Sequence, residues 1–337
     1  MPSASTIEFG TDRGKGNLLA VQPELRPADY ALPARWAAVL DGCLAGAQRR
    51  GWLNARTVAV FPEYLGAWLV VMGEPASVYG APTIRQAMRA MALRHLPRFL
   101  AALCAAREPD RARAALFRLK APAMAACYTA TFARLARQYQ CTVVAGSIIL
   151  PAPHMADGVV TCASGPLRNV SACFAPDGRV QGLVAKSFLT GDEHPFLHGA
   201  PIEELPAFDT PAGRLGILLC ADAWYPASYA RLKALGVELI AVPAYATRPW
   251  TQSWPGYDGA PTPADVDPQD IHRLSEGDAW YKYALPGRLP TSGARAGLTA
   301  FLRGQFWELG ADGHALGRIG DEVVQGADGA GLVNLWL

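Results

Sequence analysis

The stretch PAGRLGILLCADAWYPASYARLKALGVELIAVPA (211–244) indicates the fold class of this chain more directly than any other segment. Its first part, RLGILLCA, is an apolar run that predicts a buried strand. The segment 225–236 predicts a helix, and the apolar segment 237–244 predicts a second buried strand. The stretch therefore predicts a strand–helix–strand unit, in which Cys220 stands where the first strand turns toward the helix.

The rest of the chain repeats this alternation of strands and helices and adds hairpins. Turn residues at PDG (176–178) and GADG (310–313) predict two hairpins, because each lies between two strand-like runs. Strand–helix–strand units mixed with hairpins predict an α/β fold with mixed β-sheets flanked by helices. The other predicted elements are strands at 17–22, 56–63, 141–150 and 330–337, and helices at 34–51 and 124–140.

Two long segments interrupt the alternation. Segment 66–123 predicts a helical insertion with a helix near 83–107, which Pro97 should kink. Segment 246–296 is rich in Pro, Gly, Trp and Tyr and predicts a long loop region, of the kind that forms lids and binding loops. We expect residues 1–337 to form a single domain that carries both segments.

The composition excludes several classes of protein. The chain has 337 residues, of which 51% are hydrophobic, so it can bury a large core. Its 31 basic and 29 acidic side chains nearly balance, and no basic stripe indicates a nucleic-acid partner. No apolar run approaches the roughly 20 residues that span a bilayer, and the first residues show no signal-peptide pattern. The 7 scattered cysteines indicate reduced thiols rather than a disulfide framework, so we expect a cytoplasmic protein.

Three reactive side chains, Glu63, Lys186 and Cys220, close predicted strands. Taken singly, a buried cysteine is more often core filler than a nucleophile, and a strand-end charge more often reaches solvent. Their shared position favours a reactive site, because strand ends in α/β sheets present functional groups. A thiol also needs a base or a positive charge nearby in order to react. Glu193 follows Lys186 closely enough for the chain to fold back and hold the ammonium.

These motifs resemble those of the nitrilase superfamily of carbon–nitrogen hydrolases. The glutamate motif reads VAVFPEY with Glu63, the lysine motif reads GRVQGLVAKSFLTGDE with Lys186, and the cysteine motif is 211–244 with Cys220. The resemblance implies an α-β-β-α sandwich, a catalytic triad of these three residues, and Glu193 as a further catalytic glutamate. It also implies that no cofactor is needed and that the chain forms a homodimer or a larger homo-oligomer.

The chain departs from the family pattern beside the cysteine. Where relatives place an aromatic residue, this chain has Ala221, whose small side chain leaves space for a substrate or for a side chain from a long loop. Three aromatic residues of the 246–296 segment either cap this pocket or simply pack: Trp250, Trp254 and Tyr257. The predicted substrate-binding residues are Tyr64, Ala221, Trp224 and Tyr245.

The predicted function is hydrolysis of a non-peptide C–N bond in a small amide, ureido or carbamoyl compound through a thioester on Cys220. Three alternatives stay open: a nitrilase, an acyltransferase that passes the acyl group to an amine, and a non-catalytic binding or scaffold protein on the same fold. We predict no metal site, because Pro195 lies between His194 and His198 and the segment offers no third ligand. No glycine-rich nucleotide-binding pattern opens a helix after a strand.

Overall fold

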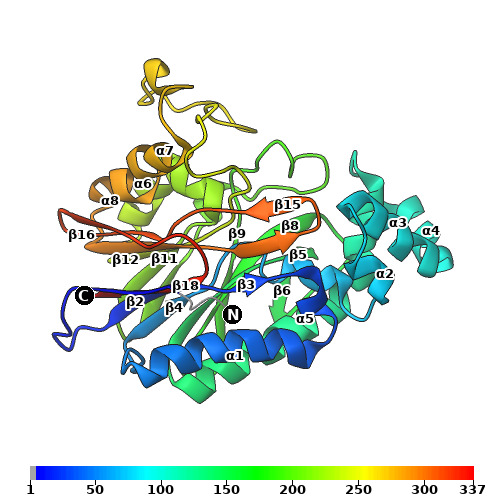
Figure 1. Ribbon diagram of the computed structural model, residues 1–337, viewed down its shortest axis with the longest axis horizontal. Helices are drawn as coiled ribbons and strands as arrows, with labels where there is room; N and C mark the ends of the chain where they lie inside the picture. Colours follow the sequence, from blue (N-terminus) through cyan, green and yellow to red (C-terminus); the bar gives the residue numbers. More distant parts are fainter. Residues whose placement is uncertain (1–4) are drawn as a thin grey trace.

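Two β-sheets pack face to face, and helices cover their outer faces (Figure 1). The computed structural model describes residues 5–337. In Figure 1, α1 (Pro33–Arg49) and α5 (Arg111–Tyr139) lie below the sheets, and α6 (Pro226–Ala234) and α8 (Leu285–Ser292) lie above them. The order of layers is helix, sheet, sheet, helix, so the predicted α-β-β-α sandwich with mixed sheets is confirmed.

The first sheet joins strands from both ends of the chain. In spatial order its strands are β1 (Ser5–Phe9), β18 (Gly331–Trp336), β2 (Asn17–Gln22), β4 (Thr57–Val60), β5 (Thr142–Pro151), β8 (Leu167–Phe174) and β9 (Val180–Ala185). Strands β2, β4 and β5 are parallel, whereas β18 runs antiparallel to β2. Strands β8 and β9 form the antiparallel hairpin predicted around 176–178.

The second sheet is built on the strand–helix–strand unit of 211–244. In spatial order its strands are β10 (Ala207–Thr210), β11 (Gly213–Ile217), β12 (Leu239–Ala244), β13 (Ala296–Phe301), β16 (Leu316–Ile319) and β17 (Glu322–Gln325). Strands β11, β12 and β13 are parallel, and α6 connects the first two of them, as predicted. The two smaller sheets are β15 (Leu309–Ala311), β14 (Arg303–Phe306) and β3 (Glu24–Leu25), and β6 (His154–Ala156) with β7 (Val159–Thr161).

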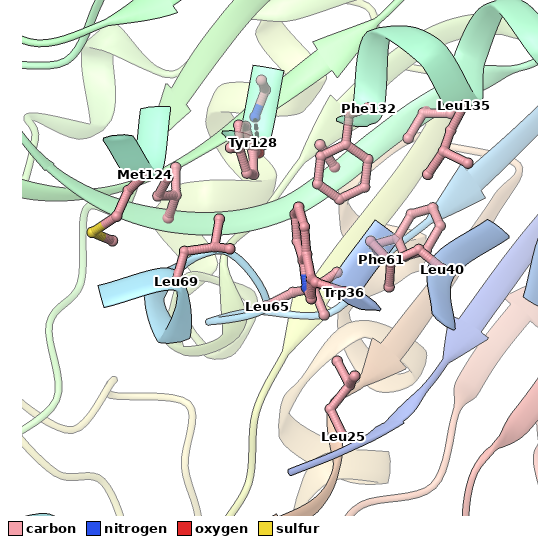
Figure 2. Close-up of a cluster of buried hydrophobic side chains, with 14 of the residues drawn as sticks. Leu25, Trp36, Leu40, Phe61, Leu65, Leu69, Met124, Tyr128, Phe132 and Leu135 are labelled. Carbon is pink, nitrogen blue, oxygen red and sulfur yellow. Dashed lines mark hydrogen bonds between the residues drawn. The ribbon is translucent and has the colours of Figure 1, made fainter. Parts of the chain in front are cut away.

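Alternating side chains of β4 build two separate cores. Val58 and Val60 point into the core between the sheets, and Ala59 and the following Phe61 belong to the core under α1 and α5. This is the two-residue period of a strand that is covered on both faces. Figure 2 shows Phe61 in this outer core, among aromatic and aliphatic side chains of the helices that include Trp36, Leu40, Phe132 and Leu135.

Helix α5 is longer than the predicted helix at 124–140. It begins at Arg111, where the Asp110 side chain accepts a hydrogen bond from the backbone N–H of Arg113 at 3.0 Å and caps the helix. Pro122 lies inside the helix without ending it. Packing of the apolar face against the first sheet outweighs the local cost of this proline.

The predicted helix near 83–107 is two helices, α3 (Ile84–Arg94) and α4 (Leu96–Ala105). Pro97 occupies the first turn of α4, a position where its missing N–H costs nothing, so the helix is interrupted at His95 instead of being kinked at Pro97. The segment before them holds the 3₁₀ helix η2 (Ala67–Val71) and the short α2 (Ala76–Tyr79). In Figure 1 this group of helices stands at the right-hand end of the sandwich.

The predicted long loop over 246–296 is wrong from residue 276 onward, where α7 (Glu276–Tyr283) and α8 lie. Ser275 caps α7 by accepting a hydrogen bond from the backbone N–H of Asp278 at 3.1 Å. These helices are short and rich in Gly, Pro and aromatic residues, and α8 is held by packing on β13 and β16 rather than by helix propensity.

The hairpin predicted at 310–313 is also corrected. The tight turn lies earlier, at Trp307 and Glu308 between β14 and β15, and Trp307 adopts a left-handed backbone with φ of 54°. Asp312, in the predicted turn, instead accepts a hydrogen bond from the backbone N–H of Trp250 at 2.8 Å.

Four further 3₁₀ helices are η1 (Pro27–Tyr30), η3 (Ile202–Glu204), η4 (Cys220–Trp224) and η5 (Pro268–Asp270). Among the helices of residues 5–337, none combines the length and the apolar character needed to cross a membrane.

Candidate active site

Glu63, Lys186 and Cys220 come together from three strand ends. Glu63 follows β4, Lys186 follows β9 directly, and Cys220 begins η4 just after β11. The first two strands belong to one sheet and the third to the other, so the site forms where the two sheets face each other. All three side chains line one cavity of about 980 Å³.

The Lys186 ammonium bridges two carboxylates. Its Nζ lies 2.8 Å from Oε1 of Glu63 and 2.7 Å from Oε2 of Glu193, and the three side chains are at most 2% exposed. Buried charges of this kind are tolerated only when they are paired and hydrogen-bonded. The contact between Lys186 and Glu193 is the one expected from their closeness in sequence.

Neutral groups complete the hydrogen bonding of the two carboxylates. The Asn169 side-chain amide donates to Oε1 of Glu63 at 2.9 Å and to Oε1 of Glu193 at 3.2 Å. The Tyr64 hydroxyl also donates to Oε1 of Glu193, and the backbone N–H of Thr190 donates to its Oε2 at 3.0 Å. The Thr190 hydroxyl donates to Oε2 as well, at 3.3 Å, so five groups of four residues hold Glu193 and fix the position of Lys186 between the two acids.

The two carboxylates differ in their proton affinity. Burial raises the pKa of Glu63. The Lys186 charge offsets part of this rise, and the Glu193 charge increases it. Burial also acts to raise the pKa of Glu193, but the Lys186 charge and the hydrogen bonds from Lys186 and Tyr64 outweigh it, so that this pKa is lowered. For Lys186, burial opposes the charged form, but Glu193 and Glu63 raise its pKa well above the usual value. Pairs of acids with opposite shifts are typical of acid–base sites.

Cys220 sits in a strained backbone conformation beside this cluster. Its φ of 47° lies in the left-handed region, which costs a residue with a side chain on the order of 1–3 kcal/mol. Tyr64, on the other side of the site, has a φ of 60°. Burial, together with the Glu63 charge, raises the pKa of the Cys220 thiol well above its usual value. The raised pKa favours the protonated thiol, and a protonated thiol needs a base in order to react as a nucleophile.

The Asp222 side chain links the turn that carries Cys220 to the segment that follows Lys186. Its fully buried carboxylate accepts hydrogen bonds from the backbone N–H groups of Ser187 at 3.0 Å, Phe188 at 2.7 Å and Leu219 at 3.3 Å. Burial raises the pKa of Asp222 to about 7, against the effect of these donors and of the Lys186 charge. The chain just after Lys186 and the chain just before Cys220 are thus joined through one side chain.

We expect Asp222→Asn to destabilise the protein by about 1–3 kcal/mol, because an amide can accept with only one of its two terminal atoms. At least one buried N–H group then loses its acceptor. Urea unfolding measures the change, and the exposed Asp177→Asn is the matched control. Equal stability of the two variants would show that Asp222 does not join the two segments.

The four predicted substrate-binding residues, Tyr64, Ala221, Trp224 and Tyr245, all line the cavity. The Tyr64 hydroxyl is also hydrogen-bonded to Glu193. Of the three aromatic residues predicted to cap or pack, Trp254 and Tyr257 also line the cavity. Trp250 packs instead, stacked on His314 with ring centroids 5.1 Å apart.

Two residues of the site were not assigned from the sequence, Asn169 and Asp222. Asn169 is a polar residue inside the largely buried strand β8, and Asp222 is an acid directly after an apolar run. A polar side chain in such a place must find partners inside the protein. This is the one signal that could have indicated them, and it does not say which partners they find.

One cluster among residues 5–337 has the side-chain types and spacing to hold a cation, namely Asp312, His314 and Asp328. The Arg303 guanidinium already occupies the position of a cation there, 2.9 Å from Asp312 and 2.7 Å from Asp328. The cluster is accounted for by this ion-pair network.

A family model of carbon-nitrogen hydrolases matches residues 55–257, more than half of the chain. The chain belongs to the carbon-nitrogen hydrolase family. The matched segment includes Glu63, Lys186, Glu193 and Cys220. The resemblance to these hydrolases that the motifs indicate is thereby confirmed.

Relatives of this carbon-nitrogen hydrolase include amidases. The deaminated glutathione amidase of Yersinia enterocolitica is 29% identical over 122 residues, which are 34% of this chain and 40% of that protein. The match thus spans less than half the length of that relative.

Solved structures with the same fold include an amidase from Nesterenkonia sp., with a TM-score of 0.57 and 17% identity over 96% of this chain and 90% of that one. A mutant of the amidase from Nesterenkonia sp. AN1, in which acrylamide has added to the active-site cysteine, has a TM-score of 0.56 and 16% identity over 96% and 93% of the two chains. At this identity the likeness shows the shared fold.

Proposed function

We propose that this chain is a thiol-dependent hydrolase that cleaves the C–N bond of an amide, ureido or carbamoyl compound, with Cys220 as nucleophile. The observation that carries the proposal is the buried Lys186, held between Glu63 and Glu193, in the same cavity as the strained Cys220. A paired ammonium, a carboxylate of raised pKa and a protonated thiol are the groups that acyl transfer from an amide needs. The amidases among the relatives support the same class of reaction.

The first half of the reaction forms a thioester. Glu63 takes the proton of the Cys220 thiol as the sulfur attacks the carbonyl carbon, and a new C–S bond forms. The Lys186 ammonium and the backbone N–H of Ala221 stabilise the negative oxygen of the tetrahedral intermediate. Glu63 then gives the proton to the leaving nitrogen, and the C–N bond breaks.

The second half of the reaction releases the acid. Glu63 takes a proton from water, whose oxygen attacks the thioester carbonyl, and the C–S bond breaks. The proton returns to the sulfur, so the thiol and the carboxylate are restored. Glu193 keeps its negative charge throughout, because its hydrogen bonds and Lys186 lower its pKa, and it positions the ammonium.

The test is turnover of a panel of amides, carbamoyl compounds and nitriles by the purified protein, with ammonia release as readout. We expect amides to be hydrolysed, and added hydroxylamine to divert the acyl group into a hydroxamate by attack on the thioester. Preferential turnover of nitriles to acid would identify a nitrilase, and new amides formed with added amines an acyltransferase. No turnover of any compound would contradict the proposal and favour a binding protein.

A further inference from the structure

The cavity that holds Cys220 continues well beyond the reacting groups. Its volume of about 980 Å³ lies at the upper end of the roughly 300–1,000 Å³ that hold drug-sized ligands. An amide of a few heavy atoms leaves most of this space empty. The extra space runs along the 66–123 segment, since η2, α3, α4 and α5 all contribute to the lining.

This part of the cavity, here called the insertion branch, has an apolar wall. The side chains that form it are Val70, Val71, Met88, Met91, Phe99 and Leu116. Five of them belong to the large core under α1 and α5, and Met88 packs against it. The wall is thus a face of the protein core, and Val70, Met88 and Phe99 are its more exposed members.

Charged residues at the insertion branch do not make its interior polar. Arg85 and Arg89 line the cavity, but both are exposed and therefore lie on its solvent side. Glu308 accepts a hydrogen bond from the backbone N–H of Ile84 at 2.7 Å, and Asp110 caps α5. These contacts hold helix ends. Arg113 also lines the cavity, but it is paired with Asp110 and lies over the Phe196 ring, so the remaining surface of the branch is mostly hydrocarbon.

We propose that the substrate is an amide that carries an apolar chain, and that this chain lies in the insertion branch. The inference rests on the proposed function, because it assigns the C–N bond of the same substrate to Cys220. Each methylene that leaves water for an apolar wall strengthens binding about threefold to fourfold. Met88 and Met91 suit a flexible chain, because methionine adapts its shape to its neighbours.

The experiment compares two substrate series, primary amides from acetamide through butyramide and hexanamide to octanamide, and N-alkyl acetamides with the same chains. We expect kcat/KM to rise about threefold per methylene in one of the series, depending on which side of the C–N bond carries the chain. A flat profile in both series, with acetamide turned over, would overturn the inference and leave the proposed function intact. No turnover at all would contradict the proposed function itself.

Two variants test whether the apolar chain of the substrate lies in the insertion branch. Ala92→Phe places a ring in the insertion branch and should lower the ratio of long-chain to acetamide kcat/KM by at least about tenfold. Leu93→Phe is the matched control, because the neighbouring side chain is 62% exposed and outside the cavity lining, and its ratio should equal that of the wild type. Met88→Ala removes atoms instead of adding them and should lower the same ratio several-fold. An unchanged ratio in both Ala92→Phe and Met88→Ala would overturn the placement of the chain.

Discussion

Replacing Cys220 with alanine should abolish amide hydrolysis. No other group in the cavity can carry the acyl intermediate in the proposed mechanism, and loss of the nucleophile of a comparable triad costs on the order of 10⁶-fold in kcat. The methyl group of alanine fits where the thiol lies, so we expect the fold and the ability to bind the substrate to persist. Ammonia release measures turnover, and the circular dichroism spectrum and thermal midpoint check the fold.

The matched control is Cys141→Ala. This cysteine is also fully buried, but it belongs to the core under α1 and α5 and does not line the cavity. It should keep kcat/KM close to the wild-type value while losing some stability. If Cys220→Ala hydrolysed any accepted amide at the wild-type rate, the assignment of the nucleophile would be wrong.

Lys186→Met should remove activity and stability together. Methionine fills a similar volume but leaves Glu63 and Glu193 as two buried carboxylates without a counter-charge. Breaking a buried ion pair by removing one partner costs roughly 3–5 kcal/mol. Urea unfolding at neutral pH should show a loss of this size, and kcat should fall by at least about 10²-fold because the oxyanion loses its strongest donor.

The effect of Lys186→Met on stability should shrink as the pH falls. In the wild type, folding lowers the pKa of Glu193. The ionised Glu193 therefore stabilises the folded protein at pH values above its unfolded pKa, and this stabilisation is lost as the pH falls through its folded pKa. In the variant, burial without the ammonium raises both folded pKa values above the unfolded ones. The resulting loss of stability is present at neutral pH and disappears as Glu63 and Glu193 take up protons.

The double variant Lys186→Met/Glu193→Gln separates charge from packing. It removes one of the two uncompensated charges, and should recover part of the lost free energy of unfolding. A Lys186→Met protein as stable as the wild type at neutral pH would contradict the description of a buried, mutually dependent charge cluster.

Local patterns in the sequence determined most of the sandwich. The apolar runs at 17–22, 141–150 and 237–244 form strands near their predicted bounds, because strands buried on both faces need uninterrupted apolar sequence. The same patterns placed Glu63, Lys186 and Cys220 at strand ends. These features depend on residues close in sequence, so the chain alone predicts them.

The way the site is held and the extent of its cavity depend on contacts between segments that are far apart in the sequence. Asn169 and Asp222 act through partners on other elements, which no local pattern names. Helix α5 runs through Pro122, and α8 forms in a segment predicted as loop, because packing on the sheets outweighs local propensity. The insertion branch likewise exists only where η2, α3, α4 and α5 meet, so its shape comes from contacts between segments and not from any one of them.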